Sequence, residues 1–308
     1  MGRLGRPSDR TRSCCDQTGV ARDYEQWQHC QTDGEPTQQG ATHADSLSAG
    51  APEVEERAGY TVEMSPMRIE IVVESIAGVE IAARCGADRV ELCGALAEGG
   101  LTPSQGLLEL AVQRAESVAV HPLIRPRPGD FRYTADELAV MVRDVRAAVL
   151  AGAHGVVVGA LGPDGLLDRA ACAALIDAAG DRQITLHRAI DASASPRQVL
   201  DQAIELGFTR VLTSGARPRA MDGAPLIAEL VTQAAGRISI MACGGIRAAN
   251  VTQVVAATGV SDVHAAVRAP VRGADGEVSF AGVGVPDGFD RFETDAEGVS
   301  ALCAALRK

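Results

Sequence analysis

The chain has 308 residues, and its 40 acidic residues against 29 basic residues give a net charge of −11. This charge argues against binding along a nucleic-acid backbone, because no basic stripe is present to displace counterions. No apolar run approaches the roughly 18 residues of a membrane span, and no apolar segment follows the N-terminal arginines as a secretory signal requires. The eight cysteines form no CxxC pair, so we expect reduced thiols and a cytoplasmic location.

The first 66 residues contain no Ile and no Phe and are rich in small and polar residues. Such a segment cannot bury enough apolar area to offset the entropy of ordering it. We therefore expect residues 1–66 to be a disordered extension and residues 67–308 to be the folded domain. Met64 and Met67 leave open a second interpretation, in which translation starts near them and the extension is a start-site artefact.

From Met67 onward, short β-branched runs alternate with longer segments that have apolar residues at helical spacing. Eight such units in about 240 residues predict an α/β fold of the (β/α)8 type, a TIM barrel. The alternative is a doubly wound open sheet, which rarely has eight units of such regularity. The expected strands are Ile69–Val73, Arg89–Cys93, Val118–Ile124, Gly155–Gly159, Ile184–His187, Arg210–Ser214, Ile238–Ala242 and Asp262–Ala265.

A quasi-repeat indicates which strand residues face the barrel interior. The segments that begin at Gly86, Gly152, Gly207 and Gly259 align without gaps and share one valine column: Val90, Val156, Val211 and Val263. Successive strand residues point to opposite faces. If the valines pack against the helices, Glu91, Val157, Leu212 and His264 point inward, as do Glu70, Val72, Thr185 and His187. The opposite orientation would bury Glu91 and His264 beneath helices, which is costly.

Functional residues of such barrels gather where the strands end, and four polar side chains there are candidates for acid–base catalysis. Glu91 is a candidate general base or acid beside His187 or His264. An inward-facing carboxylate near a barrel mouth costs free energy of desolvation, so its presence favours a functional role. Arg125 is the fourth candidate, since its guanidinium can hold an anion. The alternatives are a structural Glu91 paired with an arginine, and histidines that donate to backbone carbonyls.

A second group of residues is suited to binding a small anion. Arg127 offers a fork-shaped donor, although a salt bridge to Asp130 that fixes the loop is an equal alternative. Gly244 and Gly245 precede a helix as in many phosphate-binding turns. Ser214 and Gly215 end the neighbouring strand. The long Gly-rich segment 270–293 is a candidate lid.

Sulfur atoms form a third group. Cys93, Met241 and Cys243 have the alternation to face inward near the mouth, and thiolates and thioethers suit Cu(I). The alternative is that these side chains are small apolar packing groups. No lysine precedes Lys308, which excludes a Schiff-base mechanism in the barrel, and no motif indicates a nucleotide or organic cofactor.

Five motifs together resemble the CutC family in matching order: Arg89–Cys93, Glu98–Ser104, Ile124–Phe131, His187–Asp191 and Val211–Gly215. The resemblance implies a TIM barrel concerned with copper homeostasis, cytoplasmic and often homo-oligomeric, with Cu(I) proposed to bind cysteine thiolates. Cys93 matches one proposed copper ligand. Val72 stands where the family usually has the other cysteine, and Pro128 stands where it commonly has glycine.

Three hypotheses follow. The first is a copper-binding protein, in which Cys93 needs a partner such as Met241, Cys243, a histidine or a second subunit. The second is an enzyme that acts by acid–base chemistry on a small anionic or phosphorylated compound, because the mouth holds more polar groups than a metal carrier needs. The third is a scaffold that binds other proteins, which the N-terminal extension leaves open.

Overall fold

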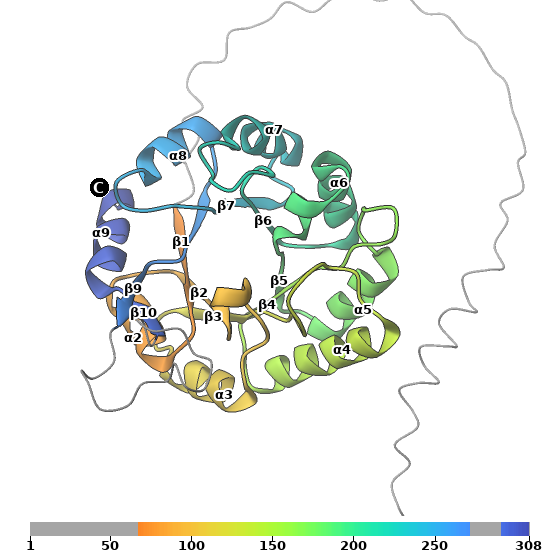
Figure 1. The fold of residues 1–308 in the computed structure, drawn as a ribbon, viewed down its shortest axis with the longest axis horizontal. Coiled ribbons are helices and arrows are strands. Elements are labelled where there is room, and N and C mark those ends of the chain that lie inside the picture. Colours follow the sequence, from red (N-terminus) through yellow and green to blue (C-terminus); the bar gives the residue numbers. More distant parts are fainter. Residues whose placement is uncertain (1–66, 272–290, 308) are drawn as a thin grey trace, which may run out of the picture. The chain divides into compact units, whose positions relative to one another are not determined.

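The computed structural model describes residues 67–271 and 291–307. Their main feature is a parallel sheet of eight strands in the order β3-β2-β1-β8-β7-β6-β5-β4, which curls into a barrel (Figure 1). The two outer strands meet through a bridge between Leu123 and Val157, where the Ile124 N–H donates to the Val157 carbonyl over 2.8 Å. The strands are β1 (Arg68–Val73), β2 (Arg89–Leu92), β3 (Ala119–Pro122), β4 (Gly155–Val158), β5 (Gln183–Leu186), β6 (Arg210–Thr213), β7 (Ser239–Ala242) and β8 (Asp262–Ala265).

Helices alternate with the strands and form a ring around them (Figure 1). Six of the described helices, all except α7 and α8, have an N-cap side chain that accepts an otherwise unpaired backbone N–H group. The expected cap Ser104 accepts from the Leu107 N–H over 3.2 Å, and Thr134 and Glu137 form a capping box. The helices are α2 (Ile76–Arg84), α3 (Gln105–Arg114), α4 (Ala135–Leu150), α5 (Arg169–Ala179), α6 (Pro196–Leu206), α7 (Ala224–Ala234), α8 (Val251–Thr258) and α9 (Ala296–Leu306). The predicted (β/α)8 barrel is therefore confirmed, and the open sheet is wrong.

The apolar core lies between the strands and the helices. The four residues of the valine column are fully buried in it, together with the other outward-facing strand residues. The inner face is more polar, since it carries Glu91 and His264. Together with Leu212, these residues line a cavity at the barrel mouth. The alternation predicted from the repeat therefore holds.

An ionic network fills the inner end of the barrel. Arg89 contacts both Glu70 and, over 3.1 Å, Asp262. Arg210 donates to Asp262 over 3.2 Å and to the Thr185 hydroxyl over 3.1 Å. All five side chains are nearly inaccessible to solvent. Breaking such a buried pair by removing one partner typically costs about 3–5 kcal/mol, because the other charge stays buried. The network closes the barrel opposite its mouth.

Some expectations differ from the structure in detail. The third strand ends at Pro122 rather than Ile124, where proline lacks the N–H that a continuous ladder needs. An antiparallel ribbon of β9 (Arg268–Val271) and β10 (Arg291–Thr294) follows the barrel and was not predicted. Most of the candidate lid, residues 272–290, and the whole extension 1–66 lie outside the described residues. In the described part of the chain, no helix is long and apolar enough to cross a membrane.

Candidate functional site

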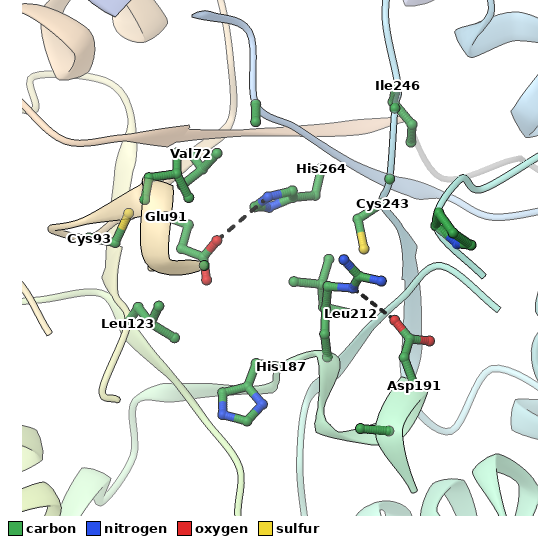
Figure 2. Close-up of a pocket in the computed structure, with 18 of the residues that line it drawn as sticks. Val72, Glu91, Cys93, Leu123, His187, Asp191, Leu212, Cys243, Ile246 and His264 are labelled. Carbon is green, nitrogen blue, oxygen red and sulfur yellow. Dashed lines mark hydrogen bonds and ion pairs between the residues drawn. The ribbon is translucent and has the colours of Figure 1, made fainter. Parts of the chain in front are cut away.

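A cavity of about 680 Å³ opens at the carboxyl ends of the strands. Figure 2 shows charged and apolar side chains from several strands around one space. One part of its wall is apolar, where Val72, Leu123 and Cys93 pack together. The polar part of the lining includes Glu91, Arg125, His187, Arg188, Asp191, Arg217, Arg247 and His264.

Glu70, His264 and Glu91 form a line of three interacting side chains. Strand pairing aligns Glu70 with His264 across β1 and β8, and aligns Val72 with Glu91 across β1 and β2. His264 Nδ1 lies 2.7 Å from Glu70 Oε1, and its Nε2 lies 3.6 Å from Glu91 Oε2. Arg89 contacts the second oxygen of Glu70. Glu70 is therefore held on both oxygens and orients the imidazole toward Glu91.

The three groups differ in their affinity for protons because their surroundings differ. Burial raises the pKa of Glu91 to about 7, and the nearby Glu70 charge acts in the same direction. Burial would also raise the pKa of Glu70, but the charge of Arg89 and the bond to His264 hold it below its usual value. Burial opposes the charged form of His264, yet the hydrogen bond to Glu70 and the Glu91 charge raise its pKa. Near neutral pH, Glu91 can therefore both accept and release a proton.

This cluster is a weak candidate for a metal centre. One ligand atom from each of Glu70, Glu91 and His264 lies within 4.8 Å of the others. However, both Glu70 oxygens already have partners, Arg89 and His264. A cation bound there would have to replace those bonds and would face the buried guanidinium. The geometry fits a proton-handling group better than a metal site.

His187 occupies another part of the wall, directly after β5. Its Nδ1 accepts a hydrogen bond from the Ala189 N–H over 3.1 Å, which caps the short helix Arg188–Ala192. Burial, together with the charge of Arg125, lowers its pKa to about 3. Phe131 packs on its ring with centroids 4.6 Å apart. His187 is therefore a neutral imidazole held in one orientation.

Arg188 is held at the mouth by a carboxylate that the motif analysis did not select as a site residue, Asp191. Its Nε donates to Asp191 over 2.9 Å and its Nη2 to the Ser214 hydroxyl over 2.6 Å. Asp191 also accepts from the Thr213 hydroxyl over 2.6 Å and from the Ala216 N–H over 3.0 Å. These bonds fix a guanidinium at the cavity edge without filling the cavity.

The turn after β7 adds backbone donors to the same wall. Gly244 and Gly245 adopt φ values of 99° and 68°, which glycine adopts without strain. A Cβ on Gly244 would lie 2.9 Å from the Pro218 carbonyl oxygen. Within the described residues, nothing accepts a hydrogen bond from the N–H of Gly244, Gly245 or Ile246. Successive backbone N–H groups of this kind are suited to an anion.

The sulfur atoms are less well arranged for copper. Cys93 packs with Val72 and Leu123, whereas Cys243 packs with Leu212 and Met241, and Figure 2 shows the two thiols on opposite sides of the cavity. Burial raises the pKa of both thiols well above its ordinary value, which opposes the thiolate that Cu(I) needs.

Met241 does not line the cavity; its sulfur accepts from the Arg89 guanidinium over 3.2 Å, so it faces a positive charge. The structure therefore places Met241 and Cys243 in one packing cluster and Cys93 in another.

The remaining predicted residues have mainly structural contacts. Arg125 lines the cavity, but it donates to the carbonyls of Glu98, Gly100 and Gly129 and so fixes two loops. Arg127 lies outside the lining and pairs with Asp130 over 3.1 Å, the alternative left open by the sequence.

Ser214 and Gly215 are likewise absent from the lining. The Ser214 hydroxyl bonds Asp191 over 3.0 Å. A Cβ on Gly215 would lie 2.3 Å from the Gly223 carbonyl oxygen, so Gly215 allows two backbone segments to pack together. Ser214 therefore helps to hold Arg188 and Asp191 at the cavity edge.

Comparisons with known proteins agree with the fold. A family model described as the CutC family matches residues 67–269. Protein CutC of Xanthomonas campestris pv. campestris is 51% identical over 205 residues, which cover 67% of this chain and 85% of the relative. Protein CutC of Mesorhizobium japonicum is 41% identical over 251 residues, or 80% and 97% of the two chains. The crystal structure of a CutC protein from Streptococcus agalactiae, assigned to copper homeostasis, matches with a TM-score of 0.62 and 32% identity over 64% of this chain and 97% of that one.

Proposed function

This chain belongs to the CutC family, and from that premise we propose that its barrel is an enzyme that performs acid–base chemistry on a small anionic compound. One observation carries the proposal: a buried carboxyl group, Glu91, faces the same cavity as a wall of anion-binding groups. The acid–base part is the line Glu70–His264–Glu91, in which Glu91 exchanges the proton. The anion-binding part is Arg188 and the turn Gly244–Gly245.

The charge distribution supports an anionic substrate. The whole chain carries a net charge of −11, yet four arginines line the cavity, namely Arg125, Arg188, Arg217 and Arg247. The Asp191 carboxylate beside them is occupied by hydrogen bonds from side chains and backbone. A locally positive mouth on an acidic protein attracts small anions to the cavity, whereas the acidic remainder of the surface repels them.

The proposed division of labour follows from the surroundings of each group. Glu91 is the base or acid, because an efficient proton-transfer group has a pKa close to the working pH. Glu70 and His264 act through Glu91: Glu70 orients the imidazole, and protonated His264 is the positive partner of Glu91 when it ionises. Arg188 and the backbone N–H groups of the β7 turn hold the anionic group and thereby fix the reacting carbon or oxygen near Glu91.

Binding of inorganic phosphate tests the anion site directly. Phosphate at 100 times its dissociation constant should stabilise the folded protein by about 2.7 kcal/mol, seen as a rise in the thermal midpoint. Arg188→Ala should abolish the rise. Arg169→Ala is the matched control, because Arg169 on α5 makes an exposed ion pair with Glu205 away from the cavity. A phosphate effect no larger than that of chloride at equal ionic strength would contradict the proposal.

Copper handling is the second candidate function, favoured by the assignment of the Streptococcus agalactiae relative to copper homeostasis and by two cysteines in one cavity. The contacts of Cys93 and Cys243 do not favour it within one chain. Titration with Cu(I) under reducing conditions and with a competing chelator decides between the candidates. Sub-micromolar binding that Cys93→Ser removes, and that Cys172→Ser on α5 retains, supports copper; equal binding by both variants excludes a copper site at Cys93.

The family resemblance also implies a homo-oligomeric, cytoplasmic protein. Both remain predictions. Light scattering coupled to size-exclusion chromatography measures the first, and a dimer or larger assembly is the expected result.

A further inference from the structure

One buried group in the cavity has a hydrogen-bonding capacity that the protein does not use. The Nε2 atom of His187 has no hydrogen-bond partner among the described residues, although the residue is only 4% exposed and lines the cavity. An unpartnered buried polar atom costs about 1–3 kcal/mol. Its presence at this place points to a ligand that supplies the missing partner.

The contacts of the ring determine what Nε2 can offer. Nδ1 accepts the Ala189 N–H, so Nδ1 carries no proton. A neutral imidazole has one proton, which must then be on Nε2. The low pKa that burial and Arg125 impose keeps the ring neutral at physiological pH. His187 is therefore a fixed hydrogen-bond donor toward the cavity. It is not a base, and it cannot bind a metal through Nε2 without losing the Ala189 bond.

The surroundings hold the ring in this orientation. Gly159 lies beneath it: a Cβ there would come within 2.6 Å of His187 Cε1 and 2.8 Å of Nδ1. Phe131 covers part of the ring at a tilt of 41°. The His187 N–H therefore needs no reorientation when the reaction occurs, which is the property of an effective oxyanion-stabilising group.

We propose that His187 is a catalytic residue that donates a hydrogen bond to a carbonyl oxygen, and that the substrate is an anionic aldehyde, ketone or keto acid with a C–H bond next to that carbonyl. The inference rests on the proposed function, because it takes the anion site and the acid–base role of Glu91 as given. It adds the reacting group of the substrate and the step that it undergoes.

The step is an enolisation. The Glu91 carboxylate takes the proton from the carbon next to the carbonyl. The C–H electron pair becomes the new C=C bond, and the carbonyl π pair moves to oxygen, where the His187 Nε2–H stabilises the developing negative charge. Return of a proton from Glu91 to the same carbon regenerates the substrate, with its hydrogen exchanged for one from solvent. In a hydroxy carbonyl compound, the hydroxyl proton can move to the former carbonyl oxygen; return of the Glu91 proton to the former carbonyl carbon then gives the isomeric carbonyl compound. No oxidant or reductant is needed.

Other ways to activate a carbonyl are poorly represented in this cavity. Imine formation needs an amine, and no lysine precedes Lys308. The Nη atoms of Arg125 are occupied by loop carbonyls, and His264 is engaged by Glu70 and Glu91. In the described lining, His187 Nε2 and Arg125 Nε are the buried side-chain nitrogens without a partner. The free backbone N–H groups of the β7 turn are assigned to the anionic group of the substrate, which leaves the neutral N–H of His187 for the carbonyl oxygen.

Proton exchange in D2O, followed by ¹H NMR, tests the inference. The probes are glycolaldehyde phosphate, dihydroxyacetone phosphate and pyruvate, with glycerol 3-phosphate as the matched alcohol that has no carbonyl. The expected result is protein-dependent deuterium at the carbon next to the carbonyl of at least one probe. Loss of one oxyanion donor typically lowers the rate about 10²–10³-fold, so His187→Phe should show this loss. His187→Gln keeps an N–H near the position of Nε2 and should restore most of it.

The controls separate this inference from the proposed function. His187→Phe should still bind inorganic phosphate as the wild type does. Phosphate binding without exchange of any carbonyl probe overturns the inference and leaves the proposed function standing, whereas absence of phosphate binding overturns the proposed function itself. ¹⁵N NMR of the wild-type ring tests the premise without a variant: at pH 7, a proton on Nε2 alone supports it, and a proton on Nδ1 or a doubly protonated ring overturns it.

Discussion

Replacing Glu91 by Gln should make the protein more stable at alkaline pH, although it removes the proposed proton-transfer group. Burial raises the pKa of Glu91 from 4.5 to about 7, so the folded state retains a proton that the unfolded chain has already lost. Below pH 4.5, Glu91 is protonated in both states and does not change the free energy of unfolding. As the pH rises from 4.5 to 7, Glu91 ionises in the unfolded state only, so the free energy of unfolding falls. Above pH 7, Glu91 is ionised in both states and the free energy of unfolding falls no further.

The magnitude follows from the two pKa values. At about 1.4 kcal/mol for each pH unit, ionising Glu91 in the folded protein costs about 3 kcal/mol at pH 8. Glutamine resembles the neutral carboxyl and avoids this cost. This cost is already net of the attraction between Glu91 and His264 across 3.6 Å, which lowers the pKa. The gain is smaller than the full amount where the glutamine amide does not reproduce the hydrogen bonds of the neutral carboxyl. We expect Glu91→Gln to be about 1–3 kcal/mol more stable than the wild type at pH 8 and about equal to it at pH 5.

Urea unfolding at several pH values between 5 and 8 measures the difference. Glu109→Gln is the matched control, because Glu109 is exposed on α3 and its partner is the Gln105 amide; its stability should follow the wild type at every pH. A Glu91→Gln variant that is less stable than the wild type at pH 8 would refute the reasoning. It would mean that the ionised Glu91–His264 contact outweighs the cost of burying the carboxylate.

Three further predictions concern the walls of the cavity. Asp191→Ala should abolish stabilisation by phosphate in a thermal-shift assay, because the loop after β6 and the guanidinium at the mouth lose their shared acceptor; retained phosphate stabilisation would argue against this. Gly159→Ala should lower the free energy of unfolding by about 1–3 kcal/mol through overpacking, since the added methyl would lie 2.6 Å from the His187 ring, and urea titration that shows no loss would contradict the packing. Cys93 should resist alkylation by iodoacetamide at pH 8 while the half-buried Cys85 reacts, because burial raises the pKa of the Cys93 thiol; mass spectrometry that finds equal labelling would contradict it.

Much of the barrel could be predicted from the sequence because two periodic signals coincide: the repeated valine column and the alternation of residues along each strand. The valine column fixes one face of strands β2, β4, β6 and β8, and the period of two along a strand then places Glu91 and His264 on the other. This inference needs no knowledge of which strands are neighbours. It therefore reached the correct face for both residues.

The interactions between strands could not be predicted in the same way. Glu70 was expected to point inward, but its bond to His264 joins residues 194 positions apart and depends on the stagger of β1 against β8. The register of β7 against β8, which pairs Met241 with Asp262, likewise explains Met241, which was expected near the mouth and lies instead against Arg89. The charged Glu70 between two isoleucines in β1 was a signal that a partner exists, but not which one.

The loop residues show the limit of residue types as a guide. The motif that contains Arg188 and Asp191 was recognised, yet its two members were not selected, because a guanidinium and a carboxylate three residues apart are common on surfaces. Only the structure shows that Asp191 is nearly saturated by backbone and hydroxyl donors. Arg125 is the converse: it was selected for catalysis, and its Nη groups support loops.

The most direct test of this account is the titration of Glu91 itself. ¹³C NMR of the glutamate carboxyl carbons, with Glu91→Gln to assign the resonance, gives its pKa in the folded protein. The account predicts a midpoint near pH 7 that rises further when phosphate is bound, because a second negative charge then lies in the same cavity. A midpoint near 4.5 that phosphate does not move would contradict it.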